Sequence, residues 1–311
     1  MRIHQVAARA ALAGGVALGY AFAEARWHAL RHVTAPVLPP GVAPIKILHI
    51  SDMHMTAGQR RKVAWVRDLA RLAPDFVAVT GDNFAFGDSM ELALEALEPL
   101  LAFPGGFVLG SNDYYAATFK NPLGYLTRRA TTPGERQPRR AVPNLPTAAF
   151  RGVLVRAGWH HLDNARAAVA LGPDRLPVAL VGLADPHVGW DEMPPPVPRP
   201  ADQLGIGLVH APYVAALRAL AHDAVRLILA GHTHGGQVAL PGFGALVSNT
   251  DLPLRYASGL HHWPASQRGG EVYLHVSKGL GTSPFAPIRF AARPEATLLT
   301  LLGAATRSAV A

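Results

Sequence analysis

Short apolar runs alternate with longer helix-like stretches along most of this chain. The runs are β-branched or leucine-rich and end at glycine, proline or aspartate, as buried strands do. They occupy residues 45–50, 76–80, 107–110, 178–183, 206–209, 225–230, 272–276 and 297–302. Between them, residues 61–73, 89–103 and 212–223 carry apolar side chains at helical spacing, with Pro212 expected at the first helical position of the last stretch. This alternation predicts an α/β domain with largely buried strands.

The first 44 residues differ from the rest of the chain. Ala10 to Ala23 is uncharged but rich in alanine and glycine, and it is shorter than the ~20 residues of a membrane-spanning helix. A helix packed on the domain or lying at a membrane surface, a membrane anchor and a signal peptide with a poor cleavage site all remain open. Residues 35–44 are proline-rich and are expected to form a stiff spacer. We therefore divide the chain into residues 1–44 and a domain of residues 45–311.

The ionisable composition narrows the chemistry. The chain has no cysteine, which excludes disulfides and thiolate metal ligands. Its net charge of +8 favours anionic partners such as phosphates, nucleic acid or an acidic membrane surface. Any metal must therefore be held by imidazole, carboxylate or amide groups.

Polar side chains gather where the predicted strands end. The loops beyond the carboxyl ends of strands in an open α/β sheet converge on one crevice. Taken singly, each of these residues could be an ordinary turn residue or helix cap. Taken together, they form a candidate ligand set, which comprises Asp52, His54, Asp82, Asn112, His210, His232 and His234.

The donor types in this set point to a catalytic metal site. Four histidines, two aspartates and an asparagine suit manganese, iron, zinc or cobalt. Seven ligands are too many for one four-coordinate structural zinc. They suit two ions that share a carboxylate and leave coordination positions open to water, which is how catalytic sites differ from structural ones.

The motif series "DMH", "GDN", "GSND", "HAP" and "GHTHGGQ" resembles the calcineurin-like metallophosphoesterase superfamily, whose pattern is D-x-H, G-D, G-N-H-[DE], H and G-H-x-H. The resemblance runs from about Ile45 to the C-terminus. The stretches "GHTHGGQVALPGFGAL" and "VSKGLGTSPFAPIRF" resemble a bacterial, often membrane-associated branch that includes hydrolases of UDP-diacylglucosamine. The resemblance implies a four-layer α-β-β-α sandwich with two mixed sheets and a dinuclear metal site at the strand C-terminal ends. It makes residues 45–311 the metallophosphoesterase domain.

The resemblance also implies a role for each ligand. Asp52, His54 and His234 would hold the first metal. Asp82 would bridge both metals, and Asn112, His210 and His232 would hold the second. We expect two divalent ions, with Mn²⁺ as the first choice and iron or zinc as alternatives. A metal-bridging hydroxide would attack a phosphodiester, phosphomonoester or pyrophosphate in line.

Residues around the ligands carry two further expectations. Asp113 and Thr233 are candidates for fixing the imidazole tautomers, the alternative being simple turn hydrogen bonds. The glycines of "GHTHGG" are expected to let this loop approach the metals closely.

The sequence departs from the family at one motif, where "GNHD" is replaced by "GSND". An ungapped match puts Ser111 at the asparagine position and Asn112 at the position of a histidine that usually donates a proton or stabilises the transition state. Either Asn112 binds the metal and the proton donor is absent, or Ser111 occupies the ligand position. We favour Asn112, because an amide oxygen is the more usual ligand. His187 could replace the proton donor or be an ordinary loop histidine.

The expected partner is a phosphorylated small molecule or lipid-linked substrate, with membrane-surface contact through residues 1–31. No specific nucleic-acid or protein partner is inferred, since the arginine-rich stretch lacks interleaved aromatic residues. The basic stretch 118–147 is expected to be a solvated loop or a flap that attracts an anionic substrate, and residues 193–200 an extended loop. The expected location is the cytoplasm or the periphery of the cytoplasmic membrane. The alternative function is a non-catalytic scaffold of the same fold or an anionic-ligand-binding protein.

Overall fold

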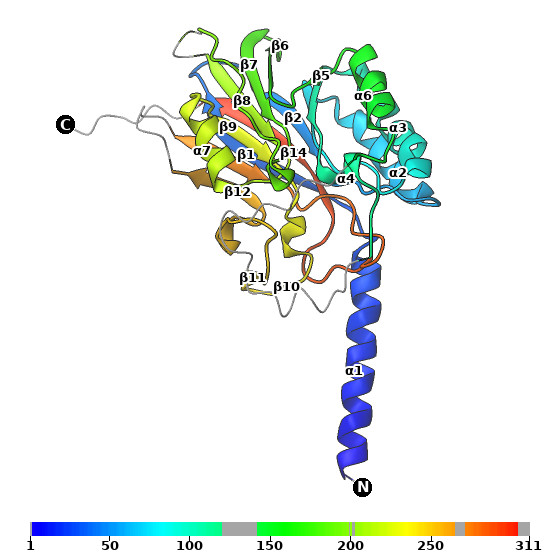
Figure 1. Ribbon diagram of the computed structural model, residues 1–311. Helices are drawn as coiled ribbons and strands as arrows, with labels where there is room; N and C mark the ends of the chain where they lie inside the picture. The colour runs from blue at the N-terminus through cyan, green and yellow to red at the C-terminus, as the bar shows by residue number, and fades with distance from the viewer. Residues whose placement is uncertain (1, 120–141, 199, 201–202, 265–270, 304–311) are drawn as a thin grey trace, which may run out of the picture.

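Two six-stranded mixed sheets lie face to face, and helices cover their outer faces (Figure 1). The computed structural model describes residues 2–119, 142–198, 200, 203–264 and 271–303. The expected four-layer α-β-β-α architecture is confirmed.

The first sheet has the order β1-β14-β2-β3-β4-β5. Its strands are β1 (Ala29–Leu38), β14 (Glu295–Gly303), β2 (Ile45–Ile50), β3 (Phe76–Thr80), β4 (Gly105–Val108) and β5 (His160–His161). The strands β2 to β5 run parallel to one another, whereas β14 is antiparallel to β2. The carboxyl ends of β2, β3 and β4 therefore lie along the same edge.

The second sheet has the order β12-β13-β9-β8-β7-β6. Its strands are β12 (Gly259–Trp263), β13 (Val272–Val276), β9 (Leu227–Ala230), β8 (Leu204–Val209), β7 (Leu176–Leu183) and β6 (Ala165–Leu171). The four central strands are parallel, and the two edge strands are antiparallel to their neighbours. A separate hairpin pairs β10 (Ala239–Leu240) with β11 (Gly244–Ala245).

Successive side chains of each strand point to opposite faces of its sheet and pack in two separate hydrophobic cores. In β3, Phe76 and Ala78 belong to the core between the sheets, whereas Val77 and Val79 pack under the helices of the first sheet. The helices over the first sheet are α2 (Arg60–Asp68), α3 (Met90–Leu97) and α6 (Thr147–Arg156), and α7 (Val214–His222) packs on the second sheet. Because both faces of both sheets are covered, the strands are apolar on both sides, as the sequence indicates.

The predicted helices end earlier than their periodicity suggests. The stretch 61–73 becomes α2 followed by a 3₁₀ helix, Leu69–Leu72. The stretch 89–103 divides into α3 and the 3₁₀ helix Glu98–Ala102, in whose first turn Pro99 lies. The position predicted for Pro212 is wrong, because α7 starts at Val214 with Tyr213 as its N-cap.

The N-terminal segment is not separated from the body where the sequence suggests. Residues 2–24 form α1 (Arg2–Glu24), which projects from the body (Figure 1). Residues 29–38 then form β1, which pairs with β14, so the first part of the expected spacer belongs to the first sheet. Pro36 is tolerated because β1 is an edge strand, and its pairing is irregular between Ala35 and Leu38.

Three further expectations concern the N-terminal helix, the basic stretch and the proline-rich loop. Among the described residues, no helix combines the length and apolarity that a membrane crossing requires. Most of the basic stretch 118–147 lies outside the described residues, since 120–141 are not among them. Residues 193–198 form neither helix nor strand.

Candidate metal centre

The strand ends of the two sheets meet at one place. The loop after β2 carries Asp52, and the loop after β9 carries His232. The amide of His232 donates hydrogen bonds to both carboxylate oxygens of Asp52, at 3.2 and 3.0 Å. This contact ties the first sheet to the second at the edge where the predicted ligands lie.

Five of the seven predicted ligands have left-handed backbone conformations. This region is uncommon for residues other than glycine, and it costs about 1–3 kcal/mol at each position. The φ angles are 48° at Asp52, 40° at His54, 56° at Asp82, 68° at His232 and 51° at His234. Such a concentration of backbone strain is typical of a functional site, where the surrounding fold holds side chains in a required geometry.

Asp52, His54 and His234 form the first group that could hold a cation. The Nε2 atoms of His54 and His234 face each other at 3.1 Å. The Oδ1 of Asp52 lies 3.6 Å from the Nε2 of His234 and 4.0 Å from that of His54. Two imidazole nitrogens and a carboxylate therefore point at one buried position.

Asp82, His210 and His232 form the second group. The Oδ2 of Asp82 lies 3.4 Å from the Nε2 of His210 and 3.5 Å from the Nε2 of His54. The Nδ1 of His232 lies 3.2 Å from the Nε2 of His210. One oxygen of Asp82 thus lies between the two groups, as a bridging carboxylate would.

Asn112 joins the second group through Asp82. Its side-chain amide donates to Asp82 Oδ2 at 2.7 Å, and its backbone amide donates to Asp82 Oδ1 at 2.8 Å. The backbone amide of Ser111 instead donates to Asp185, at 2.8 Å. Because an amide can rotate to present its oxygen, the geometry favours Asn112 over Ser111 as the residue that would contact a cation.

The model of the calcineurin-like phosphoesterase family matches residues 45–236, which include all seven predicted ligands. The chain belongs to this family. It is therefore a metallophosphoesterase, a hydrolase of phosphate esters.

Relatives of this metallophosphoesterase extend over almost the whole chain. The uncharacterized metallophosphoesterase YkuE of Bacillus subtilis (strain 168) is 27% identical over 95% of this chain and 93% of its own length. The phosphodiesterase YaeI of Escherichia coli (strain K12) is also 27% identical, over 95% of this chain and 97% of its own length. Among solved structures, TT1561 of Thermus thermophilus shares 13% identity and a TM-score of 0.41, covering 76% of this chain and 91% of its own.

Two of the phosphoesterase's ligands, His54 and Asp82, have charge states that suit a cation. Burial lowers the pKa of His54 to about 4, so its ring is neutral near neutral pH. Burial alone would raise the pKa of Asp82, but the neighbouring His210 holds it well below its usual range. Neutral imidazoles and ionised carboxylates are the forms that bind metals. At His210, burial is outweighed by the carboxylates of Asp82 and Asp185, which hold its pKa well above its usual range, so this ring would release a proton on binding a cation.

The glycine beside the first histidine of the GHTH loop is required by close packing. A side chain at Gly231 would overlap Ser51 Oγ, and its Cβ would lie 2.5 Å from Asp52 Oδ2. The sequence-based expectation that glycine allows this loop to approach the ligands therefore agrees with the structure at Gly231.

Hydrogen bonds hold the ligands, though not those expected from the sequence. Asp113 accepts from the backbone amides of Asp82 at 2.8 Å and Gly110 at 3.0 Å, and so joins two loops rather than fixing an imidazole. The hydroxyl of Thr233 donates to Ala257 O at 2.7 Å. The backbone carbonyl of Thr80 performs the expected role, because it lies 2.6 Å from His210 Nδ1 and directs Nε2 toward Asp82.

A buried hydrogen-bond chain orients Asp52. His275 in β13 and His49 in β2 meet through their Nδ1 atoms at 2.9 Å, and the Nε2 of His49 lies 2.8 Å from Thr80 Oγ1. Thr80 continues to Ser51 Oγ at 2.7 Å, and Ser51 donates to Asp52 Oδ2 at 2.5 Å. The sequence analysis missed this chain, although a histidine within each of two apolar strands was a visible signal.

Arg289 is a further residue that was not predicted from the sequence. Its side chain is fully buried, and its Nη2 lies 3.0 Å from Nδ1 of His234 while its Nη1 donates to the backbone carbonyl of His234 at 3.1 Å. Arg289 therefore holds the backbone of a predicted ligand. It lies more than fifty residues further along the chain, so no local pattern connects it to His234.

His187 lies beside the second group. Its ring centroid is 4.5 Å from that of His232, and its Nδ1 lies 3.0 Å from the hydroxyl of Tyr213. His187 therefore lies beside His232, and its role as a proton donor stays a prediction.

Asn112 and Ser111 can be distinguished by metal content. We expect Asn112→Leu to reduce the amount of the second metal retained after dialysis, because it removes the side-chain amide that contacts the carboxylate of Asp82. A loss of about 10-fold or more in metal affinity corresponds to at least about 1.4 kcal/mol of binding free energy, the size expected for a direct ligand. Ser111→Ala should retain both metals. The metal content of both variants would be measured by elemental analysis. Loss of metal from Ser111→Ala but not from Asn112→Leu would contradict this assignment.

Proposed function

We propose that this phosphoesterase binds two divalent cations and hydrolyses a phosphoester by in-line attack of water. One cation would be held by Asp52, His54 and His234, and the other by Asn112, His210 and His232, with Asp82 shared between them. The observation that carries this proposal is the position of Asp82 Oδ2, which lies 3.5 Å from His54 Nε2 and 3.4 Å from His210 Nε2. A non-catalytic scaffold would not need a carboxylate held between two ligand groups.

The protein's own residues would organise the reaction. When bound, two such cations supply a deprotonated water near neutral pH and neutralise charge on the phosphoryl oxygens. Asp82, only 2% exposed, would set the separation of the two positions. Thr80 would fix the ring of His210, and Arg289 would hold the backbone of His234, so that neither ligand has to reorganise during the reaction.

The donor set supports Mn²⁺ as the metal, with iron or zinc as alternatives, because imidazole and carboxylate ligands without thiolate suit these ions. Treatment with a chelator should abolish hydrolysis of bis(p-nitrophenyl) phosphate, and addition of Mn²⁺, Fe²⁺ or Zn²⁺ should restore it. Hydrolysis rates and metal content would be measured on the same samples. Full turnover by protein shown to contain no metal would refute the proposal.

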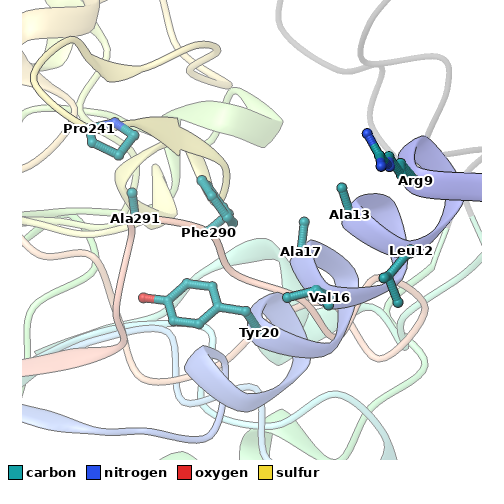
Figure 2. Close-up of a pocket in the computed structure, with 9 residues that line it drawn as sticks. All are labelled: Arg9, Leu12, Ala13, Val16, Ala17, Tyr20, Pro241, Phe290 and Ala291. Atoms are coloured by element: carbon teal, nitrogen blue, oxygen red, sulfur yellow. The ribbon is translucent and has the colours of Figure 1, made fainter. Parts of the chain in front are cut away.

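We further propose an amphiphilic setting for the substrate, with α1 at an anionic membrane surface. Leu12 and Val16 on α1 are 71% and 66% exposed. A cavity of about 730 Å³ separates α1 from the loops carrying Pro241 and Phe290 (Figure 2). Apolar side chains that line a helix and its neighbouring loops favour contact with lipid, and the net charge of +8 favours anionic headgroups. A lipid-linked phosphoester would reach the enzyme at such a surface.

This membrane proposal predicts a difference between two matched variants. Val16→Glu should weaken co-sedimentation with phosphatidylglycerol vesicles by about 10-fold, since burying a valine side chain contributes roughly 1.5 kcal/mol. Val197→Glu makes the same change at a side chain that is 62% exposed in the proline-rich loop, and should bind as the wild type does. Equal sedimentation of Val16→Glu and wild type would count against α1 as the contact.

A further inference from the structure

A second cavity, of about 510 Å³, lies at the base of α1 and beside the start of α2. Its lining includes Arg26 from the turn after α1, Arg60, Arg61 and Lys62 from the first turn of α2, and His28. No aspartate or glutamate is among the residues that line it in the described part of the chain. The cavity is therefore a polar site whose charged lining is entirely cationic.

The first turn of α2 has an unusual charge for its position. The N-terminus of a helix carries unpaired amide groups and a partial positive charge, which acidic side chains normally offset. The first turn of α2 has no acidic residue, and its N-cap, Gln59, makes no side-chain capping hydrogen bond. Arg60 forms an ion pair with Glu95 at 2.6 Å, which leaves Arg61 and Lys62 to add positive charge beside the cavity.

Lys62 is buried, and no carboxylate among the described residues forms an ion pair with it. Its side chain reaches Met53, whose carbonyl accepts from Nζ at 2.9 Å, and the residue is only 6% exposed. Burial, together with Arg289 and Arg26, lowers the pKa of Lys62 to about 7. A bound anion would offset this unfavourable environment by charge pairing.

His28 presents a second unsatisfied group. Its Nε2 is buried and has no hydrogen-bond partner among the described residues. Burial, followed by the nearby Lys62, lowers the pKa of His28 to about 4. Like Lys62, the His28 ring lies in surroundings that disfavour its charged form. A bound anion would favour that charged form.

We propose that this cavity is a binding site for a phosphate group, separate from the two ligand groups of the metal centre. Several cations and the amides of a helix start match the multiple oxygens of phosphate better than the two of a carboxylate. One wall is Gly281, whose Cα packs so closely that an added Cβ would lie 2.7 Å from His54 Cβ. A phosphate bound here would therefore lie beside the loop that carries His54. It belongs either to a free phosphate compound or to a phospholipid headgroup.

Calorimetric titration of the metal-loaded full-length chain with inorganic phosphate tests the site directly. Wild type should bind phosphate at this site in addition to any binding at the metal centre. Lys62→Met should weaken that event by about 10-fold and Arg61→Ala, at an exposed position, by several-fold. Arg71→Ala is the matched control, because Arg71 is 83% exposed, pairs with Asp68 and lies outside the cavity. Phosphate inhibition of phosphodiester hydrolysis reports the metal centre and should be unchanged in Arg71→Ala.

Vesicles distinguish the two sources of phosphate. Binding to phosphatidylglycerol vesicles is measured with phosphatidylcholine vesicles as the reference. A fall in this binding of about 10-fold in Lys62→Met and several-fold in Arg61→Ala would assign the site to a headgroup. A change in the phosphate titration alone would assign it to a free compound. The proposal is overturned if folded Arg61→Ala and Lys62→Met match wild type in both measurements. Because neither readout requires turnover, failure of the site and failure of the proposed hydrolysis are distinguishable.

Discussion

Asp82→Ala is expected to lower phosphodiester hydrolysis by at least about 10³-fold and to reduce the bound metal at both positions. Metal stabilisation of a phosphoryl transition state amounts to several kcal/mol, and each 1.36 kcal/mol is a factor of ten in rate. Asp82 Oδ2 contacts both ligand groups, so its removal should affect both, whereas loss of His54 should mainly affect the first group. Elemental analysis and turnover would be measured on the same preparation.

Two further variants separate the role of this carboxylate from folding. Asp82→Asn keeps an oxygen that can accept from the amide of Asn112 but removes the negative charge, and it should still lose most of the activity. Asp88→Ala removes an exposed carboxylate from the same loop region and should behave as wild type. If Asp82→Ala retained both metals and full turnover while melting normally, Asp82 would not be a bridging ligand.

The sequence predicted the central strands and the convergence of the candidate ligands because both follow from local pattern. Each ligand comes shortly after an apolar run, and parallel strands bring their carboxyl ends to one edge. The first group, Asp52, His54 and His234, is the set that the family resemblance assigned to the first metal, and the second group joins His210 and His232 to Asp82, which the resemblance makes a bridging ligand. Asn112 contacts Asp82, and its assignment as a metal ligand stays a prediction.

The edge strands were not predictable in the same way. β1 contains Pro36 and directly precedes a proline-rich stretch, which locally resembles a spacer. Only pairing with β14, more than 260 residues away, makes this segment a strand. β6 and β12 were also missed, because a strand at an edge need not be apolar along its whole length: β6 contains Arg166, and β12 contains His261 and His262.

The side chains that position the ligands were missed for a different reason. Thr80 and Arg289 contact the centre only once distant strands and loops have come together. Arg289 lies in the stretch 276–290 that resembles a branch of the family, but nothing in that stretch indicates which ligand it contacts. Their contribution is visible only from the three-dimensional contacts, and it is largest at Arg289.

Arg289→Met is expected to destabilise the protein by about 3–5 kcal/mol, the range typical of removing one partner from a buried charged network. The guanidinium of Arg289 donates to the backbone carbonyls of Lys278, Gly281, Ala292 and His234, at 2.7, 2.5, 3.0 and 3.1 Å. Methionine fills similar space but leaves these carbonyls buried without donors. At about 2–4 °C per kcal/mol for a domain of this size, the melting temperature should fall by roughly 10 °C.

The same variant should weaken the first metal position more than the second. Removing Arg289 frees the backbone carbonyl of His234 and the loop that carries this ligand, and loss of such a supporting contact typically costs 10–100-fold in metal affinity. Arg289→Lys keeps the charge but cannot reach the same set of carbonyls, so it should melt between wild type and Arg289→Met. Arg71→Met, at an exposed arginine, should change neither property. If Arg289→Met melted within about 2 °C of wild type, the backbone carbonyls that Arg289 contacts would have found other donors. If its metal affinity were unchanged, His234 would not depend on Arg289.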